Sequence, residues 1–283
     1  RYAVQSQLSF HGFDPEEALI EWKPKEGKQL LELEDLKSIL DSQGDEVALL
    51  LIGGVNYYTG QYLDIKKIAE LGHAKKCMVG IDLAHGAGNI QPNLHDSSID
   101  FAAWCTYKYL NSGPGSLSGL FVHEKHAQRK DLPRFAGWWN HNKETRFNMR
   151  QPFDVMSGAE GWQLSNPPIL SMAAIKASLD IFEKVGMDVL VKKSKKLTGF
   201  FEYLVNEIAS DTIEIITPTN PNERGCQLSL QVKNADKNLH KKLTENNIIT
   251  DWREPDVIRC APVPMYTSFE DVYHMVTILE SLL

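Results

Sequence analysis

Two ionisable residues, Asp82 and Lys108, each follow a short apolar segment and precede a turn that contains glycine. Lys108 comes after residues 104–107 and before a turn with Gly113 and Gly115. A lysine fixed at the end of a buried strand loses hydration, which lowers its amine pKa, and a neutral amine forms a Schiff base with an aldehyde. An ordinary surface lysine is the alternative, and Lys108 taken alone favours it.

Asp82 ends a predicted buried strand, and His85 follows three residues later. A carboxylate at this place either caps the following loop or meets a cation. Beside a Schiff-base lysine the useful cation is a protonated pyridine nitrogen, because a charged ring accepts electrons from a substrate carbanion. His85 either stacks on such a ring or fills the loop. An aspartate followed one strand later by Lys108 therefore predicts pyridoxal phosphate as cofactor.

Other polar residues could complete such a site. A cofactor phosphate needs hydroxyl, amide or indole donors. Tyr107 would share a pocket with Lys108 if the chain bends at the strand end, and core packing is its alternative. Trp138 and Asn166 lie in irregular segments where donors can converge, although Trp138 is equally suited to anchor an interface. Arg259 ends an apolar strand, where it forms either a surface ion pair or a bidentate grip on an amino-acid carboxylate.

The segments that position these residues alternate between strands and helices. Residues 47–52 form a continuous apolar run, which is typical of a strand buried on both faces of a parallel sheet. A helix over 64–72 with Asp64 as N-cap follows, and then a second buried strand over 78–81. A strand over 118–122 is expected to be antiparallel to its neighbour, and residues 20–23 also read as a strand. This order predicts a doubly wound α/β arrangement.

The pattern changes in the last third of the chain. Short strands over 213–217 and 226–232 alternate with helices over 237–246 and 269–282. We therefore expect a large α/β domain over residues 1–180 and a smaller α+β domain over residues 181–283.

Composition and spacing exclude several functions. The net charge of −7 argues against a nucleic-acid surface. No apolar stretch approaches the roughly 20 residues that cross a bilayer, so we expect no membrane segment. The four cysteines are widely spaced, as in a reducing cytoplasm. No histidine pair has the spacing of a metal site, and residues 86–88 do not form a nucleotide-binding loop. The chain starts as if in mid-helix, so we expect a further segment before Arg1.

Five motifs together resemble one family, the kynureninases, which are pyridoxal-phosphate enzymes of the class-V aminotransferase type. The similarity runs over residues 1–283, and the motif around Lys108 is highly specific. The motifs are GVNYYTGQ at 54–61, DLAHGAGN at 82–89, WCTYKYLN at 104–111, SNPPIL at 165–170 and RCAPVP at 259–264.

The resemblance implies a fold-type I large domain, a small C-terminal domain and a homodimer with a shared active site. It also implies a reaction: hydrolytic Cβ–Cγ cleavage of L-kynurenine or 3-hydroxy-L-kynurenine to L-alanine and an anthranilate, in tryptophan catabolism and NAD biosynthesis. Lys108 would carry the cofactor and remove the α-proton. Asp82 would meet the pyridine nitrogen, His85 would lie beside the ring, and Tyr107 would donate a proton later.

By the same resemblance, Tyr107, Trp138 and Asn166 contact the phosphate, some of them across the dimer interface. Arg259 binds the substrate carboxylate, while Ser165 and Asn166 border the aryl pocket. The family often has serine where this chain has Gly53, which removes one hydroxyl near the cofactor. An aromatic residue and an acid of the cofactor site would lie in the segment before Arg1.

Two other functions stay open from the sequence. A related fold-type I lyase of the cysteine desulfurase kind needs a reactive cysteine on a mobile loop. Cys77 and Cys105 lie in strand-like runs, and Cys226 and Cys260 lie in the expected small domain, so this function ranks lower. The other alternative is a folded chain that binds no cofactor.

Overall fold

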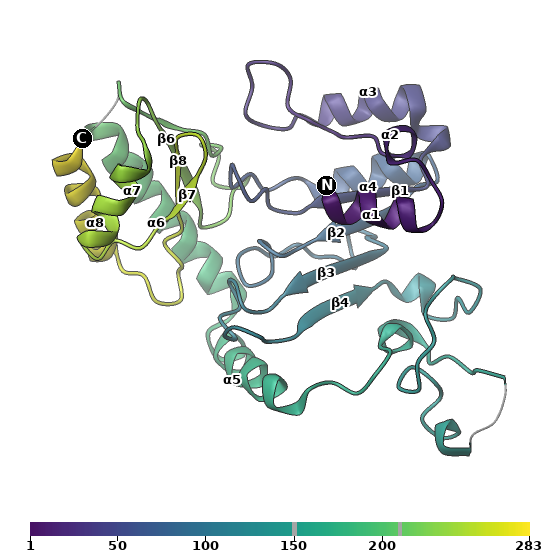
Figure 1. Cartoon of the computed structure of the whole chain (residues 1–283). Coiled ribbons are helices and arrows are strands. Elements are labelled where there is room, and N and C mark those ends of the chain that lie inside the picture. The colour runs from purple at the N-terminus through teal and green to yellow at the C-terminus, as the bar shows by residue number, and fades with distance from the viewer. Residues whose placement is uncertain (149–151, 209–210) are drawn as a thin grey trace.

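Two four-stranded sheets organise residues 1–148, 152–208 and 211–283, which are the residues that the computed structural model describes. Their strand orders are β1-β2-β3-β4 and β5-β6-β8-β7 (Figure 1). The strands are β1 Leu49–Gly53, β2 Met78–Asp82, β3 Phe101–Cys105, β4 Ser118–Val122, β5 Ile213–Ile215, β6 Leu228–Val232, β7 Asp251–Arg253 and β8 Val257–Cys260.

Helices surround and connect the sheets. The α-helices are α1 Tyr2–Phe10, α2 Pro15–Ala18, α3 Leu33–Gln43, α4 Ile65–Ala74, α5 Ile169–Val185, α6 Met187–Ile208, α7 Lys237–Glu245 and α8 Phe269–Leu282. Short 3-10 helices cover Gly44–Glu46, Glu124–His126, Arg146–Asn148 and Gly158–Trp162. Among the described residues, none of these helices combines the length and the apolar character needed to span a membrane.

The first sheet has the expected topology. Strands β1, β2 and β3 are parallel, and β4 is antiparallel to β3. Figure 1 shows β3 running toward the second sheet and β4 running away from it. The carboxyl ends of the three parallel strands therefore face the second sheet, at the edge where α/β folds bind ligands.

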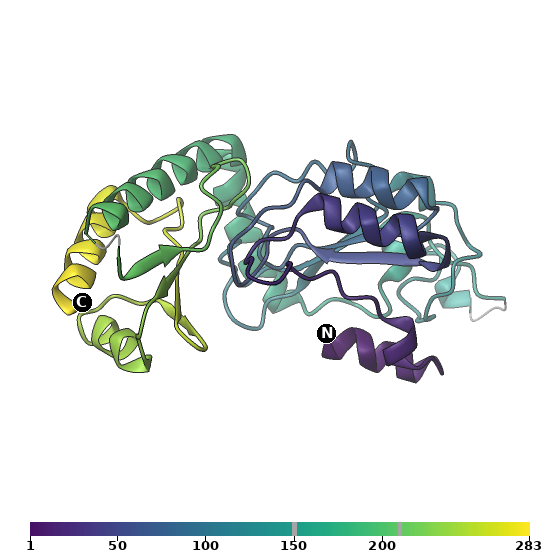
Figure 2. The same cartoon turned by 90° about the horizontal axis from the view of Figure 1, so that it is seen from above.

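The two faces of the first sheet differ. One face packs with α3 and α4 around buried Val79 and Ile81. On the other face, Leu49 and Leu51 are 44% and 45% exposed. Figure 2 shows α1 and α2 on that other side, but neither helix buries a residue. The expectation that the first strand is buried on both faces is therefore wrong, because no packed layer within the described residues covers its second face.

Two glycines in this sheet give room to rings on neighbouring strands. A Cβ atom on Gly80 would lie 2.3 Å from the Phe101 ring, on the open face. A Cβ atom on Gly119 would lie 2.2 Å from the Trp104 indole, on the opposite face. Each ring therefore occupies the space that a side chain on the adjacent strand would otherwise fill.

Local predictions near the N-terminus had mixed outcomes. Asp64 caps α4 as expected, because its Oδ1 accepts a hydrogen bond of 3.1 Å from the Lys67 amide. The predicted strand over residues 20–23 is wrong, since this segment has no regular structure. Trp22 packs on the core of the first sheet while Glu21 pairs with Lys23 at the surface, and no strand pairs with this segment in the part of the chain that the structure describes.

The second sheet forms a separate core with α6, α7 and α8. Leu197, Leu228 and Leu279 are fully buried in it. The strands predicted over 213–217 and 226–232 correspond to β5 and β6, whereas β7 was not expected. We keep residues 1–180 and 181–283 as a proposed division into two domains; residue 180 falls within α5.

Candidate active site

Gly53, Asp82 and Ala103 lie side by side on β1, β2 and β3; Gly53 and Asp82 end their strands, and Ala103 lies in the middle of β3. The Gly54 amide donates a hydrogen bond of 2.9 Å to the Asp82 carbonyl, and the Leu83 amide donates one of 2.8 Å to the Ala103 carbonyl. Backbone pairing thus continues past the strand ends and fixes the start of the loop after Asp82.

The Asp82 side chain caps the loop that follows β2, which is one of its two sequence interpretations. Its Oδ1 accepts a hydrogen bond of 2.8 Å from the Ala84 amide, so it caps the following loop. Asp82 is exposed at the edge of the open sheet face, and its Oδ2 has no hydrogen-bond partner among the described residues. One carboxylate oxygen therefore holds the loop while the other stays available to a cation.

Lys108 lies in a bend beyond the end of β3, and its side chain is partly exposed. Hydroxyl groups fix this bend. The Ser112 hydroxyl donates to the Thr106 carbonyl at 2.6 Å, and the Thr106 and Ser116 hydroxyls are 2.9 Å apart. The Asn111 amide also donates to the Lys108 carbonyl at 2.9 Å. The expected turn that fixes this lysine is present, although the strand itself ends at Cys105.

The loop after Asp82 and the bend that carries Lys108 touch one another. The Cys105 thiol lies 3.8 Å from the Ala84 carbonyl oxygen. Gly88 has a φ of +80°, and a Cβ atom there would lie 2.8 Å from the Tyr109 carbonyl group. Only glycine allows both this backbone conformation and this close approach.

His85 lies between the two segments. Its ring meets the Tyr109 ring edge-on at 5.9 Å between centroids. Burial and the positive charges of Lys108, Arg259 and Arg253 lower the pKa of His85 to about 4. The ring is therefore neutral at pH 7, and its buried Nδ1 has no partner among the described residues. The three cations that act on it belong to the same site.

Arg259 reaches this site from β8 in the second sheet. Its Nη1 donates to the Tyr57 carbonyl at 2.5 Å, and its Nη2 pairs with the Asp251 carboxylate. Burial lowers the pKa of Arg259. The ion-pair interpretation is thus correct in part, but the guanidinium is largely buried and acts on His85 rather than lying at an open surface.

The remaining predicted residues are more dispersed. Tyr107 is 51% exposed, and a hydrogen bond with the Cys105 side chain raises its pKa. Trp138 packs edge-on against Trp139 at 5.2 Å between centroids. Figure 1 shows the segment between β4 and α5 leaving the far end of the sheet before it returns to α5. No contact within the described residues joins Trp138 to Lys108.

Ser165 and Asn166 lie in the exposed segment that leads into α5. The Ser165 hydroxyl donates to the Asn166 side-chain oxygen at 3.3 Å, and neither side chain contacts Lys108 or Asp82 among the described residues. One chain thus brings together Gly53, Asp82, His85, Lys108 and Arg259. It does not bring Trp138, Ser165 or Asn166 to them.

The residues that do meet fit pyridoxal phosphate. The Lys108 amine makes no hydrogen bond or ion pair with the described residues, and the Asp82 carboxylate has a free oxygen at the same sheet edge. The Nδ1 atom of the neutral His85 ring is buried and has no hydrogen-bond partner among the described residues, so a bound ligand could supply that partner. Lys108 offers an amine for the cofactor aldehyde, Asp82 offers an acid for the pyridine nitrogen, and His85 offers an imidazole to lie beside the pyridine ring.

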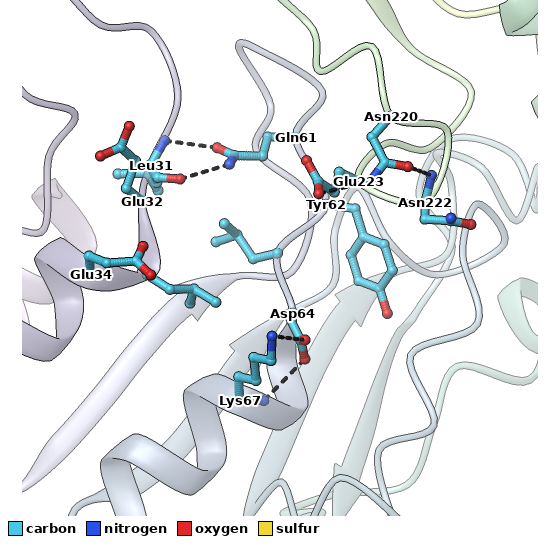
Figure 3. A pocket seen from close by; sticks show the side chains of 12 residues that line it. Leu31, Glu32, Glu34, Gln61, Tyr62, Asp64, Lys67, Asn220, Asn222 and Glu223 are labelled. Carbon is cyan, nitrogen blue, oxygen red and sulfur yellow. Dashed lines mark hydrogen bonds and ion pairs between the residues drawn. The ribbon is translucent and has the colours of Figure 1, made fainter.

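A separate pocket lies where the two sheets' loops meet. Figure 3 shows the Gln61 amide, which exchanges hydrogen bonds of 3.0 and 2.9 Å with the Leu31 backbone. Asn220 and Glu223 from the other side complete its wall. None of the predicted functional residues lines this pocket, and its polar groups are largely paired with one another. It is a junction between the two parts of the chain rather than the predicted site.

Known proteins identify the family. Residues 190–279 match the family model described as kynureninase C-terminal domain. The kynureninase of Flavobacterium psychrophilum is 53% identical over 283 residues, which cover 99% of this chain and 67% of that protein. The chain belongs to the kynureninase family. The kynureninases of Myxococcus xanthus and Mus musculus are 52% and 45% identical, with 66% and 62% of their lengths covered. The chain thus spans about two thirds of the length of these relatives.

Solved structures confirm the predicted fold. A cysteine desulfurase from Thermococcus onnurineus superposes with a TM-score of 0.78 at 16% identity, covering 99% of this chain and 69% of that one. A mutant of the lyase C-DES, with glycine covalently linked to its pyridoxal phosphate, gives a TM-score of 0.81 at 17% identity, covering 99% and 70%. At these identities the likeness shows the fold-type I architecture alone.

Sequence reasoning missed four residues of this site. Tyr57, Tyr109, Asp251 and Arg253 are each in contact with a predicted residue or act on His85. The alternation of polar Asp251 and Arg253 around an apolar tryptophan was the available signal for β7. A strand there would have placed both side chains on the face of Arg259.

Proposed function

We propose that this chain carries the active site of a kynureninase, which hydrolyses the Cβ–Cγ bond of L-kynurenine or 3-hydroxy-L-kynurenine. Water is consumed, and L-alanine and the corresponding anthranilate are released. The observation that carries this proposal is the grouping of Asp82, His85, Lys108 and Arg259 in a chain 53% identical to a kynureninase.

Each of these residues has a role that its surroundings support. Bound pyridoxal phosphate supplies an electron sink for the charge that develops at the substrate α-carbon. The Lys108 amine would hold the cofactor and would take the α-proton of the substrate. The free oxygen of Asp82 would hold the pyridine nitrogen of the cofactor protonated. The Arg259 guanidinium orients the α-carboxylate, and Tyr107, partly exposed beside Lys108, returns a proton in the later steps.

Replacement of Lys108 tests this function. In Lys108→Ala, we expect the visible absorbance band of the bound cofactor to disappear and anthranilate release from kynurenine to fall at least about 10³-fold, because an alanine neither anchors the cofactor nor moves the proton. Lys241→Ala, on the exposed surface of α7, is the matched control and should keep both properties. A Lys108→Ala protein that retains the band and full turnover would refute the assignment.

A cysteine desulfurase-like reaction is less suited to this chain. Such chemistry needs an accessible thiolate. Cys226 and Cys260 are buried, and burial raises the pKa of each thiol to about 12. Cys77 is also buried, and burial raises its pKa. Sulfide release from cysteine without anthranilate formation from kynurenine would reverse this preference.

We also propose a homodimer in which Trp138, Ser165 and Asn166 serve the site of the partner. Two observations support it: within the described residues of one chain, none of these three contacts Lys108, and the segment that carries them exposes large apolar side chains. Phe147 is 77% exposed and Leu170 is 91% exposed. Patches of this kind mark interaction surfaces. A cytoplasmic location is proposed as well, supported by the four free cysteines.

Mixed dimers test the shared site. Lys108→Ala and Trp138→Ala should each be nearly inactive alone. If Trp138 serves the partner's site, a mixture refolded together should recover activity, because mixed dimers contain one site with both native residues. A mixture that stays as inactive as its components would contradict the shared site.

A further inference from the structure

Three charged residues share one face of the strand pair β7–β8. Asp251 lies directly opposite Arg259, and Arg253 lies opposite Val257. Because side chains alternate along a strand, Asp251, Arg253 and Arg259 point to the same side while Trp252 enters the core of the second sheet. This pairing places one carboxylate between two guanidinium groups.

The contacts of Arg259 leave one edge of its guanidinium free. The Nη2 group pairs with the Asp251 carboxylate, and Nη1 donates to the Tyr57 carbonyl at 2.5 Å. The Nε group is buried and has no partner among the described residues. An unpartnered donor in a buried setting is costly unless a ligand completes it. The Nε edge is therefore where an incoming carboxylate gains most.

Arg253 also pairs with the Asp251 carboxylate. Its Nη2 lies 3.1 Å from Asp251 Oδ2, and its own Nε is also buried without a partner among the described residues. Both arginines lower the pKa of His85, so both act on the site that holds Lys108. One carboxylate between two guanidiniums leaves the group with a net charge of +1, which still attracts an anion.

We propose that Asp251 is the positioning residue of this site: it holds the Arg259 guanidinium with its Nε edge toward the substrate α-carboxylate. This inference rests on the proposed function and extends it. Asp251 does not touch the substrate. It acts through Arg259, which without it keeps a single hydrogen bond, to the Tyr57 carbonyl, and loses its fixed orientation.

The two possible roles of Asp251, a positioning residue or only a neighbouring negative charge, predict opposite changes in anion binding when the carboxylate is removed. Removal of a carboxylate that merely repels the substrate would tighten the binding of an anion. Removal of a positioning carboxylate weakens it, because a charged hydrogen bond that orders the guanidinium is lost. The sign of the change in affinity therefore separates the two roles.

The test uses the intact protein loaded with pyridoxal phosphate and the variant Asp251→Asn, which keeps the shape of the side chain. We expect KM for kynurenine to rise about 10-fold while kcat changes less than about 3-fold, since orientation of the carboxylate contributes mainly to binding. Asp256→Asn is the matched control. Asp256 lies in the turn between β7 and β8 and accepts hydrogen bonds from Gln231, at 3.2 and 3.0 Å, instead of from an arginine.

Calorimetric titration with L-alanine and with L-alaninamide gives a second readout. Asp251→Asn should bind L-alanine about 10-fold more weakly than the unaltered protein does. Its affinity for L-alaninamide, which lacks the carboxylate charge, should be unchanged. Equal or tighter L-alanine binding, or an equal loss for both ligands, would overturn the positioning role. If the unaltered protein binds L-alanine but does not cleave kynurenine, the proposed function fails, and the same titration still decides the role of Asp251.

Discussion

The neutral His85 ring should make the stability of the cofactor-free protein depend on pH. In the folded chain, burial and the charges of Lys108, Arg259 and Arg253 hold the pKa of His85 at about 4, against an ordinary value of 6.5. Between these two values the unfolded chain binds a proton that the folded chain does not. Folding stability therefore rises with pH through the window from about 4 to 6.5 and falls as the medium is acidified.

The change in the free energy of unfolding follows from the difference between the folded and unfolded pKa values of His85. At pH 5 the difference in proton binding corresponds to about 2 kcal/mol, and screening of this partly exposed side chain reduces it to about 1 kcal/mol. For a protein of this size, that free energy corresponds to a change of about 2–4 °C in the unfolding temperature. His85→Phe removes the titrating group and keeps an aromatic ring against Tyr109.

The assay is thermal unfolding of the cofactor-free protein at pH 5 and at pH 7. We expect acidification to lower the unfolding temperature of His85→Phe by about 2–4 °C less than that of the unaltered protein. His274→Asn, at an exposed position of α8, is the control and should follow the unaltered protein. An identical pH response in His85→Phe and the unaltered protein would refute a neutral, half-buried histidine at this position.

Two further replacements test the packing and the polar contacts around the first sheet. Gly88→Ala should lower the free energy of unfolding by more than the roughly 1–2 kcal/mol of a left-handed residue, because its Cβ would lie 2.8 Å from the Tyr109 carbonyl group. Gly113→Ala, with φ +83° and no neighbour within 4 Å, isolates the backbone cost, so equal urea-unfolding losses would contradict the clash. Asp100→Asn should cost about 3–5 kcal/mol in urea unfolding at pH 7, since Asp100 accepts hydrogen bonds from Val79, His73, Lys125 and His126. Burial alone would raise its pKa, but these donors hold it below the usual value, so this contribution persists above about pH 4 and is lost under stronger acid. Asp96→Asn, at the exposed surface, should cost less than about 0.5 kcal/mol, and a similar loss in both variants would contradict the role of Asp100.

The sequence predicted best those features that depend only on residues close together in the chain. Apolar runs and glycines predict that Asp82 and Lys108 follow neighbouring strands; Asp82 does end β2, whereas Lys108 lies in the bend just beyond the end of β3. The cap of α4 at Asp64 and the span of α8 were predictable for the same reason, because caps and amphipathic helices depend on nearby residues.

Features that depend on distant parts of the chain were not predictable. The open face of the first sheet could not be inferred from residues 47–52, because an apolar strand looks the same whether one or both faces are covered. β7 is only three residues long, and its place beside β8 is set by tertiary pairing. The long segment between β4 and α5 offers no periodicity, so the position of Trp138 relative to Lys108 could not be derived from the sequence.

Because the Phe101 ring packs directly over Gly80, the residue types allowed at these two positions on adjacent strands depend on each other. Alanine in place of Gly80 is tolerable only if the phenylalanine becomes smaller, because the ring already fills the place of the new methyl group. The same holds for Gly119 and Trp104. Natural variation at each pair should be correlated, and a mutagenesis library that randomises one partner without the other would return mostly misfolded proteins.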